Sequence, residues 1–270
     1  MPNHQLDDQN SIFYLHEPPS RDGAPTFYFV NALTGTTDHW EGAAGPALRA
    51  AGFGTLSYNF RGQTGSSFDP AIELTNQVIV EDIVTLNNAL SPSKPILVGL
   101  SIGGLFAAQA RNAGVDAAGL VFLNTLRRIG PRIDWINNAL VHYSQLGGPQ
   151  MFMDATFPMV VNPEFAAAAR PNMLKGNYEP LPPEHGHMNL IRNSPQADWD
   201  FDWASLDLPV LSITGHHDRV FRDPEVIDEL YALLPDARRE EWTDCGHMIP
   251  LERPERMIES LLKFGAEVEG

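Results

Sequence analysis

Three residues that together could perform nucleophilic chemistry occur along this chain in the order Ser101, Asp218, His247. A serine hydroxyl is a weak nucleophile until a base takes its proton. Histidine suits that task because its unperturbed pKa lies near neutrality, and a carboxylate must then hold the imidazole in the correct orientation. The order serine, acid, histidine is the one expected where strands of an open α/β sheet deliver these residues to one edge.

Ser101 lies in VGLSIGG, between the apolar run 95–100 and a helix-like segment. A serine in a sharp strand-to-helix turn has a strained backbone and presents its Oγ above the sheet. Gly99 and Gly103 would be needed there because a β-carbon at either position would crowd the turn. The positive end of the following helix would favour negative charge at the site. The alternative is an ordinary serine in a glycine-rich turn.

His247 is the base that we select among nine histidines, because it follows the last weak strand and precedes a C-terminal helix. Asp218 lies four residues beyond an apolar strand, at the same expected edge of the sheet. Asp223 and Asp244 are nearby carboxylates that could compete with it for this role.

The elements that would position these residues alternate between short apolar runs and helix-like segments. Runs that read as buried strands are 26–30, 54–60, 95–100, 119–124 and 209–214, with 238–243 as a weaker edge strand. Helices are expected at 40–51, 73–90, 101–113, 224–234 and 254–264. Such alternation predicts an α/β fold with a mostly parallel sheet flanked by helices on both faces.

One long interval interrupts this alternation. Between the fourth of these strands and the fifth lie about 80 residues without a convincing strand, rich in proline and aromatic residues. We expect helices there at 133–146, 164–169 and 188–192, placed over the carboxyl ends of the strands. The bulky residues of this interval could line an acyl pocket or form a small core of their own: Trp135, Tyr143, Met151, Phe152, Met153, Phe157, Met159, Tyr178, Trp199 and Trp203.

Five motifs together resemble the α/β-hydrolase fold superfamily, in its cap-bearing branch of esterases and lactonases. They are the oxyanion loop FVNALTGTTDHW, the turn NFRGQTGSS, the nucleophile elbow GLSIGG, the acid loop ITGHHDRVF and the histidine loop CGHMIPLERPE. The resemblance implies an α/β-hydrolase core over 1–125 and 209–270. It also implies a helical cap over 126–208, inserted after the sixth strand.

The same resemblance implies the roles of individual residues. Ser101 would be the nucleophile, His247 the general base and Asp218 the orienting acid of a triad that forms an acyl-enzyme from a carboxylic ester or lactone. The backbone N–H groups of Leu33 and Ile102 would form the oxyanion hole. No cofactor is implied. The aspartate nucleophile of the dehalogenase and epoxide hydrolase branches is replaced by serine at position 101, which disfavours both reactions.

The chain departs from the family pattern at two places. Asn31 and Ala32 stand where the family usually has His-Gly, and Asn59 and Gln63 replace the usual Asp and His. Because the oxyanion donors are backbone groups, they do not depend on which side chains surround them, and the oxyanion hole can survive the first change.

Other residues that could do chemistry have simpler interpretations. The histidine pairs at 216–217 and 185/187 do not match a helical zinc motif and no third ligand is placed by the sequence, so no metal site is predicted. Cys245 is expected to be a small buried residue beside the histidine loop. Glu252 is expected to be a helix-start charge outside the chemistry.

Composition limits the partners. A formal net charge of −16 disfavours nucleic acid and anionic membranes, so a small-molecule ester or lactone is the expected partner. The single cysteine excludes an internal disulfide. Residues 1–10 lack the basic start and apolar run that are typical of a signal peptide, and no apolar stretch of this sequence approaches about 20 residues. We therefore expect a cytoplasmic protein, and the sequence leaves open whether it forms a homodimer.

Two other kinds of function are compatible with the sequence. An acyltransferase or a C–C bond hydrolase could use the same triad, and such an enzyme would be separated from an esterase by acceptor alcohols or by vinylogous diketone substrates. A non-catalytic receptor for a small ligand could also use this fold. A receptor has no chemical need for a base beside the serine, so the complete triad disfavours it.

Overall fold

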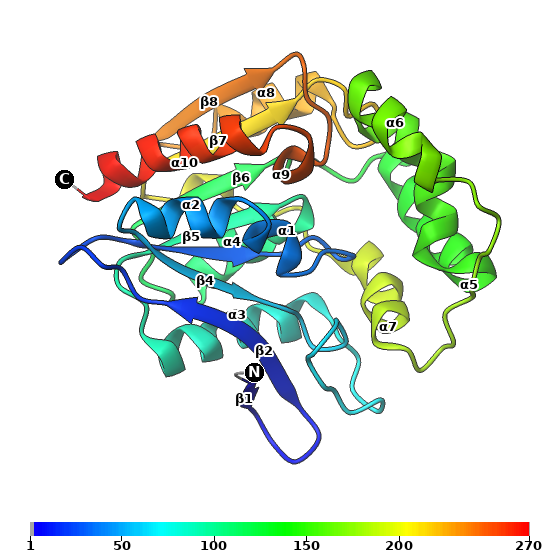
Figure 1. Ribbon diagram of the computed structural model, residues 1–270, viewed down its shortest axis with the longest axis horizontal. Helices are drawn as coiled ribbons and strands as arrows, with labels where there is room; N and C mark the ends of the chain where they lie inside the picture. Colours follow the sequence, from blue (N-terminus) through cyan, green and yellow to red (C-terminus); the bar gives the residue numbers. More distant parts are fainter. Residues whose placement is uncertain (1–2, 270) are drawn as a thin grey trace.

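The computed structural model describes residues 3–269, and its centre is an eight-stranded sheet (Figure 1). The strands lie side by side in the order β1-β2-β4-β3-β5-β6-β7-β8. β2 pairs antiparallel with both β1 and β4, and the other neighbouring strands of this sheet pair parallel. The strand bounds are β1 Asn3–Gln5, β2 Ser11–Glu17, β3 Thr26–Val30, β4 Gly54–Tyr58, β5 Pro95–Leu100, β6 Gly119–Leu123, β7 Val210–Gly215 and β8 Ala237–Trp242.

The six strands expected from the sequence are confirmed, and β1 and β2 were not expected. β3 to β7 are buried along their whole length, which is why they read as continuous apolar runs. β2 (SIFYLHE) is only partly buried and pairs with β4 at the antiparallel end of the sheet. Its mixture of apolar and polar residues gives no continuous apolar signal.

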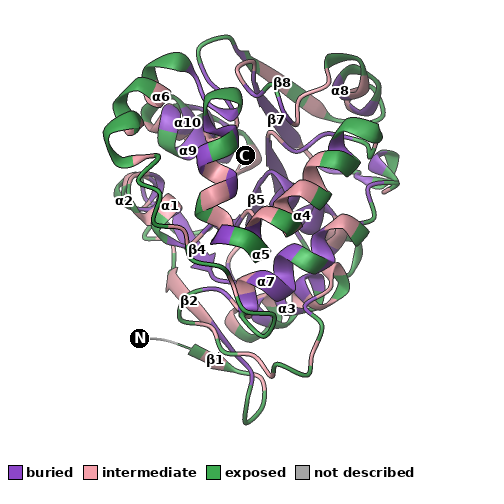
Figure 2. Ribbon diagram, turned by 90° about the vertical axis from the view of Figure 1, so that its right-hand side faces the viewer, coloured by how far each residue is buried: buried purple, intermediate pink, exposed green. Residues whose placement is uncertain are grey.

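Helices cover both faces of the sheet. Helices α3 (Asn76–Leu90), α4 (Ile102–Asn112) and α8 (Pro224–Tyr231) pack on one face, with buried residues such as Ile83, Phe106 and Leu230. Helices α1 (Asp38–Glu41), α2 (Ala44–Ala50), α9 (Ile249–Glu252) and α10 (Pro254–Glu269) lie on the other. The sheet is buried between these layers, and the helices expose their outer sides (Figure 2).

Strand alternation divides the interior into two cores. In β3, Tyr28 and Val30 enter the core beneath α3 and α4, whereas Phe27 and Phe29 enter the core beneath α2 and α10. The helix expected at 40–51 is divided into α1 and α2, with Ala43 between them in a non-helical conformation. The covered parallel sheet confirms the predicted α/β fold class.

The segment between β6 and β7, residues 126–208, is called the helical insertion below. It contains α5 (Pro131–Val160), α6 (Pro163–Ala169), α7 (Gly186–Asn193) and the short 3-10 turns η1 (Arg170–Asn172), η2 (Ser194–Gln196) and η3 (Trp203–Ser205). α5 is kinked at Gly147 and Gly148, whose backbones are non-helical, so its first half matches the expected helix. The insertion extends from the carboxyl ends of the strands (Figure 1).

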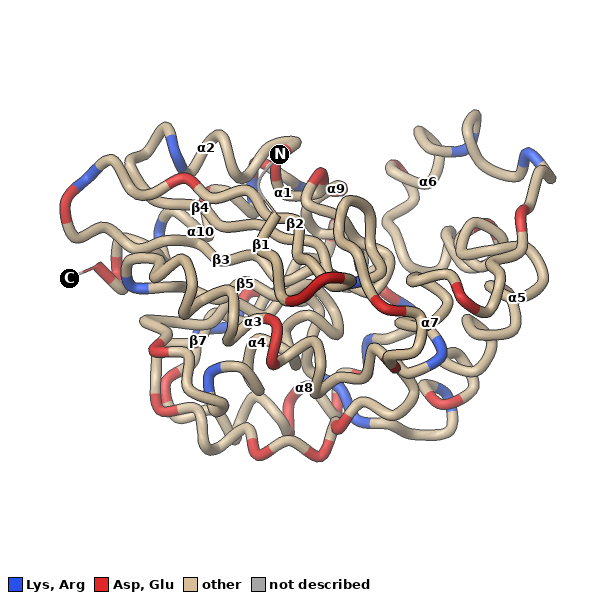
Figure 3. Tube along the Cα trace, turned by 90° about the horizontal axis from the view of Figure 1, so that it is seen from below, with Lys and Arg blue, Asp and Glu red and all other residues tan. Residues whose placement is uncertain are grey.

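Acidic and basic residues are interspersed along the chain, in both the core and the insertion (Figure 3). None of the helices within residues 3–269 has the length and apolarity that spanning a membrane requires.

Candidate active site

Ser101 lies at the junction of β5 and α4 with φ 58° and ψ −123°. This positive φ is strained for a residue with a β-carbon. A β-carbon on Gly99 would lie 2.3 Å from the Cα of Gly104, and one on Gly103 would lie 2.5 Å from the carbonyl oxygen of Val30. The expected sharp turn is therefore present, and only glycine fits on either side of the serine.

Asp218 and His247 meet at the same edge of the sheet. The Nδ1 atom of His247 is 2.6 Å from Oδ2 of Asp218. The other carboxylate oxygen, Oδ1, accepts hydrogen bonds from the backbone N–H groups of Val220 at 3.2 Å and Phe221 at 2.9 Å. Burial alone would raise the pKa of Asp218, but His247, the Phe221 amide and the charge of Arg127 together lower it below its usual value.

The two competing carboxylates are engaged elsewhere. Asp223 caps α8 by accepting from the Val226 amide. Asp244 forms ion pairs with Arg253 and Arg256 at 2.9 and 2.8 Å. Of the three candidates, Asp218 is the one hydrogen-bonded to His247.

Glu252 holds the loop on which His247 lies. Its Oε2 accepts from the backbone N–H groups of Gly246 at 2.8 Å and Asn162 at 2.7 Å, and its Oε1 accepts from Met248 at 2.9 Å. Glu252 lies in the single turn of α9, as a helix-start charge would, but it is also buried, which the sequence did not predict. Its carboxylate ties the histidine loop to the helical insertion.

The proposed oxyanion donors border the same cavity as Ser101. Within residues 3–269, the backbone N–H groups of Leu33 and Ile102 have no hydrogen-bond partner. Ile102 begins α4, so the positive end of that helix faces the site. Gln63 holds the loop after β3, which contains Leu33, by donating from Nε2 to the carbonyl oxygens of Leu33 at 3.0 Å and Ala32 at 3.3 Å.

The residues that depart from the family pattern form one buried network. Asn31 donates from Nδ2 to the side-chain oxygens of Asn59 at 3.1 Å and Gln63 at 3.3 Å, and its Oδ1 accepts from the indole N–H of Trp40 at 2.7 Å. Asn59 in turn accepts from the backbone N–H of Thr37 at 2.8 Å. The two departures are therefore coupled, since these amide side chains bond one another beneath the loop.

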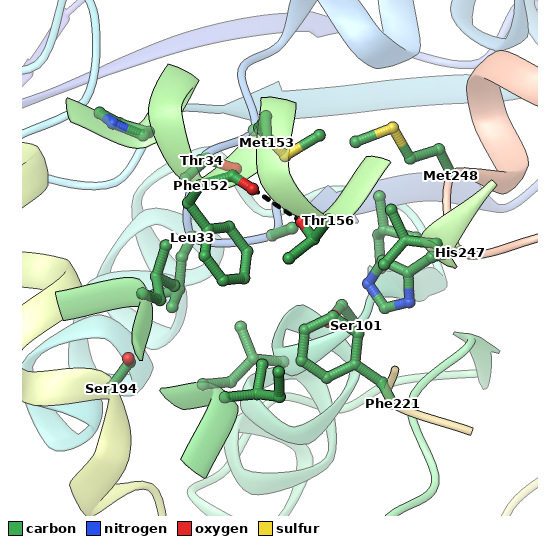
Figure 4. A pocket seen from close by; sticks show the side chains of 18 of the residues that line it. Leu33, Thr34, Ser101, Phe152, Met153, Thr156, Ser194, Phe221, His247 and Met248 are labelled. Carbon is green, nitrogen blue, oxygen red and sulfur yellow. Dashed lines mark hydrogen bonds between the residues drawn. The ribbon is translucent and has the colours of Figure 1, made fainter. Parts of the chain in front are cut away.

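A largely apolar cavity lies above Ser101, between the sheet edge and α5 (Figure 4). Figure 4 shows Ser101 and Phe221 below Phe152 and Thr156 of the insertion, with His247 to the right. Among the bulky residues singled out from the sequence, Phe152, Met153 and Trp199 line the cavity. Others do not: Phe157 and Trp203 belong to hydrophobic cores, and Trp135 is 77% exposed.

Arg127 also lines the cavity, and the sequence interpretation missed it. Its Nη2 donates to Ser101 Oγ at 2.9 Å and to the carbonyl oxygen of Asn124 at 2.8 Å, and its Nε donates to that of Thr125 at 3.2 Å. Burial lowers its pKa to about 10 against the opposing charge of Asp218. One signal could have identified it: a basic residue lies four positions beyond β6, at the edge where ligands bind.

No group of three or more potential metal ligands occurs among the described residues. In the pair at 185 and 187, Nδ1 of His185 accepts from the backbone N–H of His187. Cys245 is fully buried, and burial raises the pKa of its thiol.

The chain is similar to known proteins in both sequence and fold. The model of the Alpha/beta hydrolase family matches residues 23–260. The 3-oxoadipate enol-lactonase 1 of Acinetobacter baylyi is 25% identical over 258 residues, covering 92% of this chain and 91% of its own. The α/β hydrolase MGS-M2 from a Medee basin deep-sea metagenome superimposes with a TM-score of 0.83 at 18% identity, covering 98% of this chain and 97% of its own. A thermophilic esterase from Thermogutta terrifontis superimposes with a TM-score of 0.78 at 20% identity, covering 99% of this chain and 97% of its own.

Proposed function

The chain belongs to the alpha/beta hydrolase family, and on that premise we propose that it is a serine hydrolase of carboxylic esters or lactones. The observation that supports this most strongly is the 2.6 Å contact between His247 Nδ1 and Asp218 Oδ2 beside the strained Ser101. The apolar cavity and the amides of Leu33 and Ile102, which have no partner in the described part of the chain, supply the other parts that acyl transfer needs.

The first half of the reaction forms an acyl-enzyme. Ser101 Oγ attacks the carbonyl carbon while its proton passes to Nε2 of His247, and the ionised Asp218 stabilises the resulting imidazolium. The oxyanion accepts hydrogen bonds from Leu33 and Ile102. His247 then returns its proton to the leaving oxygen as the ester bond breaks. From a lactone, the freed hydroxyl stays attached to the acyl group.

Water completes the cycle. His247 takes a proton from water, whose oxygen attacks the acyl carbon, and the proton returns to Ser101 Oγ as the carboxylic acid leaves. Within the described chain, Ser101 Oγ is hydrogen-bonded to Arg127 and has no bond to His247. A hydroxyl can accept from Arg127 and still donate to His247, so both contacts are compatible with proton transfer.

The helical insertion supplies about half of the apolar residues that line the cavity, and we assign it the role of a cap over the core residues 1–125 and 209–270. Side chains from α5 and from the segment after η2 face Ser101 across the cavity. Excluding water there would strengthen every electrostatic interaction with the developing oxyanion. The enol-lactonase among the curated relatives and the structurally similar esterase both support ester and lactone chemistry.

The test is hydrolysis of chromogenic esters from acetyl to dodecanoyl, alongside simple lactones. Ser101→Ala and His247→Ala should each lower kcat by about 10⁴-fold or more while leaving the circular dichroism spectrum unchanged. A fluorophosphonate should label wild type at the peptide that contains Ser101. His142→Ala, an exposed change on α5, is the matched control and should retain full activity.

Retention of more than a few per cent of activity by Ser101→Ala would overturn the serine mechanism. Tight binding of esters without turnover by wild type would favour a receptor instead.

A further inference from the structure

We propose that the substrate carries a carboxylate, and that Arg127 binds this group beside the reacting carbonyl. The inference rests on the proposed serine hydrolase function and narrows its substrate to an ester or lactone with an anionic acyl group. It follows from one observation: a buried guanidinium borders the cavity with one of its terminal nitrogens unused.

The contacts of Arg127 leave one edge of its guanidinium free. Nε and Nη2 donate to the carbonyl oxygens of Thr125 and Asn124 and to Ser101 Oγ. Within residues 3–269, Nη1 has no hydrogen-bond partner. The side chain is only 5% exposed and lines the cavity, so this donor is available to a bound ligand.

Two aromatic rings hold the guanidinium in place. Its carbon lies 4.8 Å from the ring centre of Trp199 and 4.9 Å from that of Phe221. Cation–π contacts of this kind are strengthened when water is excluded. The planar group is therefore fixed before a ligand arrives, and less conformational entropy is lost when a carboxylate binds to it.

A purely structural role as counter-ion to Asp218 does not account for this arrangement. Both oxygens of Asp218 already accept hydrogen bonds, from His247, Val220 and Phe221, and none comes from Arg127. A structural partner would be expected to bond the carboxylate directly, as Arg61 does with Asp82 through two contacts of 2.8 Å.

The charges around the cavity favour an anion. The chain as a whole has a formal net charge of −16, yet none of the described aspartates or glutamates lines this cavity. Arg127 is the one permanently charged side chain among the described residues that border it. A cation in an apolar cavity interacts with a ligand anion through a low effective dielectric, so the attraction is stronger than it would be at the surface.

Geometry sets the distance between the two ends of the substrate. Nη2 is 2.9 Å from Ser101 Oγ, the atom that attacks the carbonyl. A carboxylate oxygen on Nη1 would lie about 3 Å from that nitrogen. The carboxylate then lies roughly 4–6 Å from the reacting carbon, the span of about two or three methylene groups. Half-esters of succinate and glutarate have this spacing.

The experiment compares monomethyl glutarate with methyl pentanoate, which matches it in length but lacks the charge. Wild type should favour the anionic ester in kcat/KM. Arg127→Met should lower the ratio of the two kcat/KM values by about 100-fold, because a charge-assisted hydrogen-bonded pair is lost. Arg127→Lys should give a ratio between those of wild type and Arg127→Met, since lysine keeps the positive charge but lacks the planar set of N–H donors. Arg128→Met, at the neighbouring exposed arginine paired with Glu229, is the matched control and should leave the ratio unchanged.

Glutarate binding separates this inference from the proposed function. Ser101→Ala should bind glutarate in calorimetry, and Ser101→Ala/Arg127→Met should not. Arg127-dependent binding without hydrolysis of either ester would support the carboxylate site and overturn the serine hydrolase function. Hydrolysis of both esters with a ratio that Arg127→Met leaves unchanged would overturn the carboxylate site alone. Failure of Ser101→Ala to bind glutarate would also count against the site.

Discussion

The strand-end site of the core and the helical insertion face one another across a single cavity, but they are built in different ways. In the core, Ser101, Asp218 and His247 lie just beyond β5, β7 and β8, and backbone geometry fixes their positions. In the insertion, a kinked helix presents apolar side chains such as Phe152 and Met153. The core therefore supplies the three residues Ser101, Asp218 and His247 in fixed positions, and the insertion supplies apolar walls together with Arg127.

This difference determines how mutations should act. A change in the core should remove transition-state stabilisation and lower kcat, whereas a change in the insertion should alter which substrates fit. Glu252 is the exception, because its carboxylate bonds the histidine loop and the backbone of Asn162 together. The two regions are thus separable in function, although Glu252 and the backbone hydrogen bond from His247 N–H to the carbonyl oxygen of Val160 join them.

The largest effect in this comparison is expected from Asp218→Asn, which should lower kcat by about 10⁴-fold with little change in KM. An amide in place of the carboxylate can hold His247 in the wrong tautomer and cannot stabilise the imidazolium. Steady-state kinetics on the best ester from the chain-length series would measure this effect.

Asp223→Asn is the matched control, since it changes the cap of α8 and a surface pair with Arg132 and should leave kcat within about twofold. Equal losses from both substitutions would mean that Asp218 is not the orienting acid.

The polar half of the site was open to prediction because its signals are local. The elbow glycines around Ser101 and the position of His247 after the last strand follow from short-range rules of turns and sheet edges. Arg127 was missed because its role depends on Trp199 and Phe221, which are far away in the sequence and contact it only in the folded chain.

The buried role of Glu252 and the kink in α5 escaped prediction for a similar reason. In sequence, an E-R-P-E run reads as the start of a helix, and nothing in it shows that three backbone N–H groups converge on the first glutamate. The apolar residues of the insertion were equally suited to a small core or to a pocket wall. In the structure Phe157 belongs to a small core and Phe152 lines the cavity, and this distinction arises only from packing in the folded chain.

Glu252→Gln should have an intermediate effect and should change both the stability of the fold and the rate of catalysis. The amide would place an NH₂ group against backbone N–H donors that the carboxylate now satisfies, at a cost of about 1.5–3 kcal/mol. We expect Tm to fall by roughly 3–10 °C and kcat by about tenfold, because the loop holding His247 loosens. Calorimetry and kinetics on the same preparation would show both.

Glu255→Gln, an exposed change in the first turn of α10, controls for the loss of one negative charge. Should Glu252→Gln lower Tm without any change in kcat, its carboxylate would stabilise the fold without positioning the base.

The smallest effect should come from Phe152→Ala, and it should appear in selectivity. Phe152 faces the cavity from α5, so its removal enlarges the acyl pocket and should shift the preferred ester by two or more carbons, with kcat/KM for short esters reduced about tenfold. Trp135→Ala removes a larger ring from the same helix, but that ring is 77% exposed and lies outside the cavity. Its chain-length profile should match wild type. If both variants shifted the chain-length profile equally, the loss of either ring would act by destabilising α5. The selectivity would then depend on the folding of the insertion and not on the shape that Phe152 gives to the cavity.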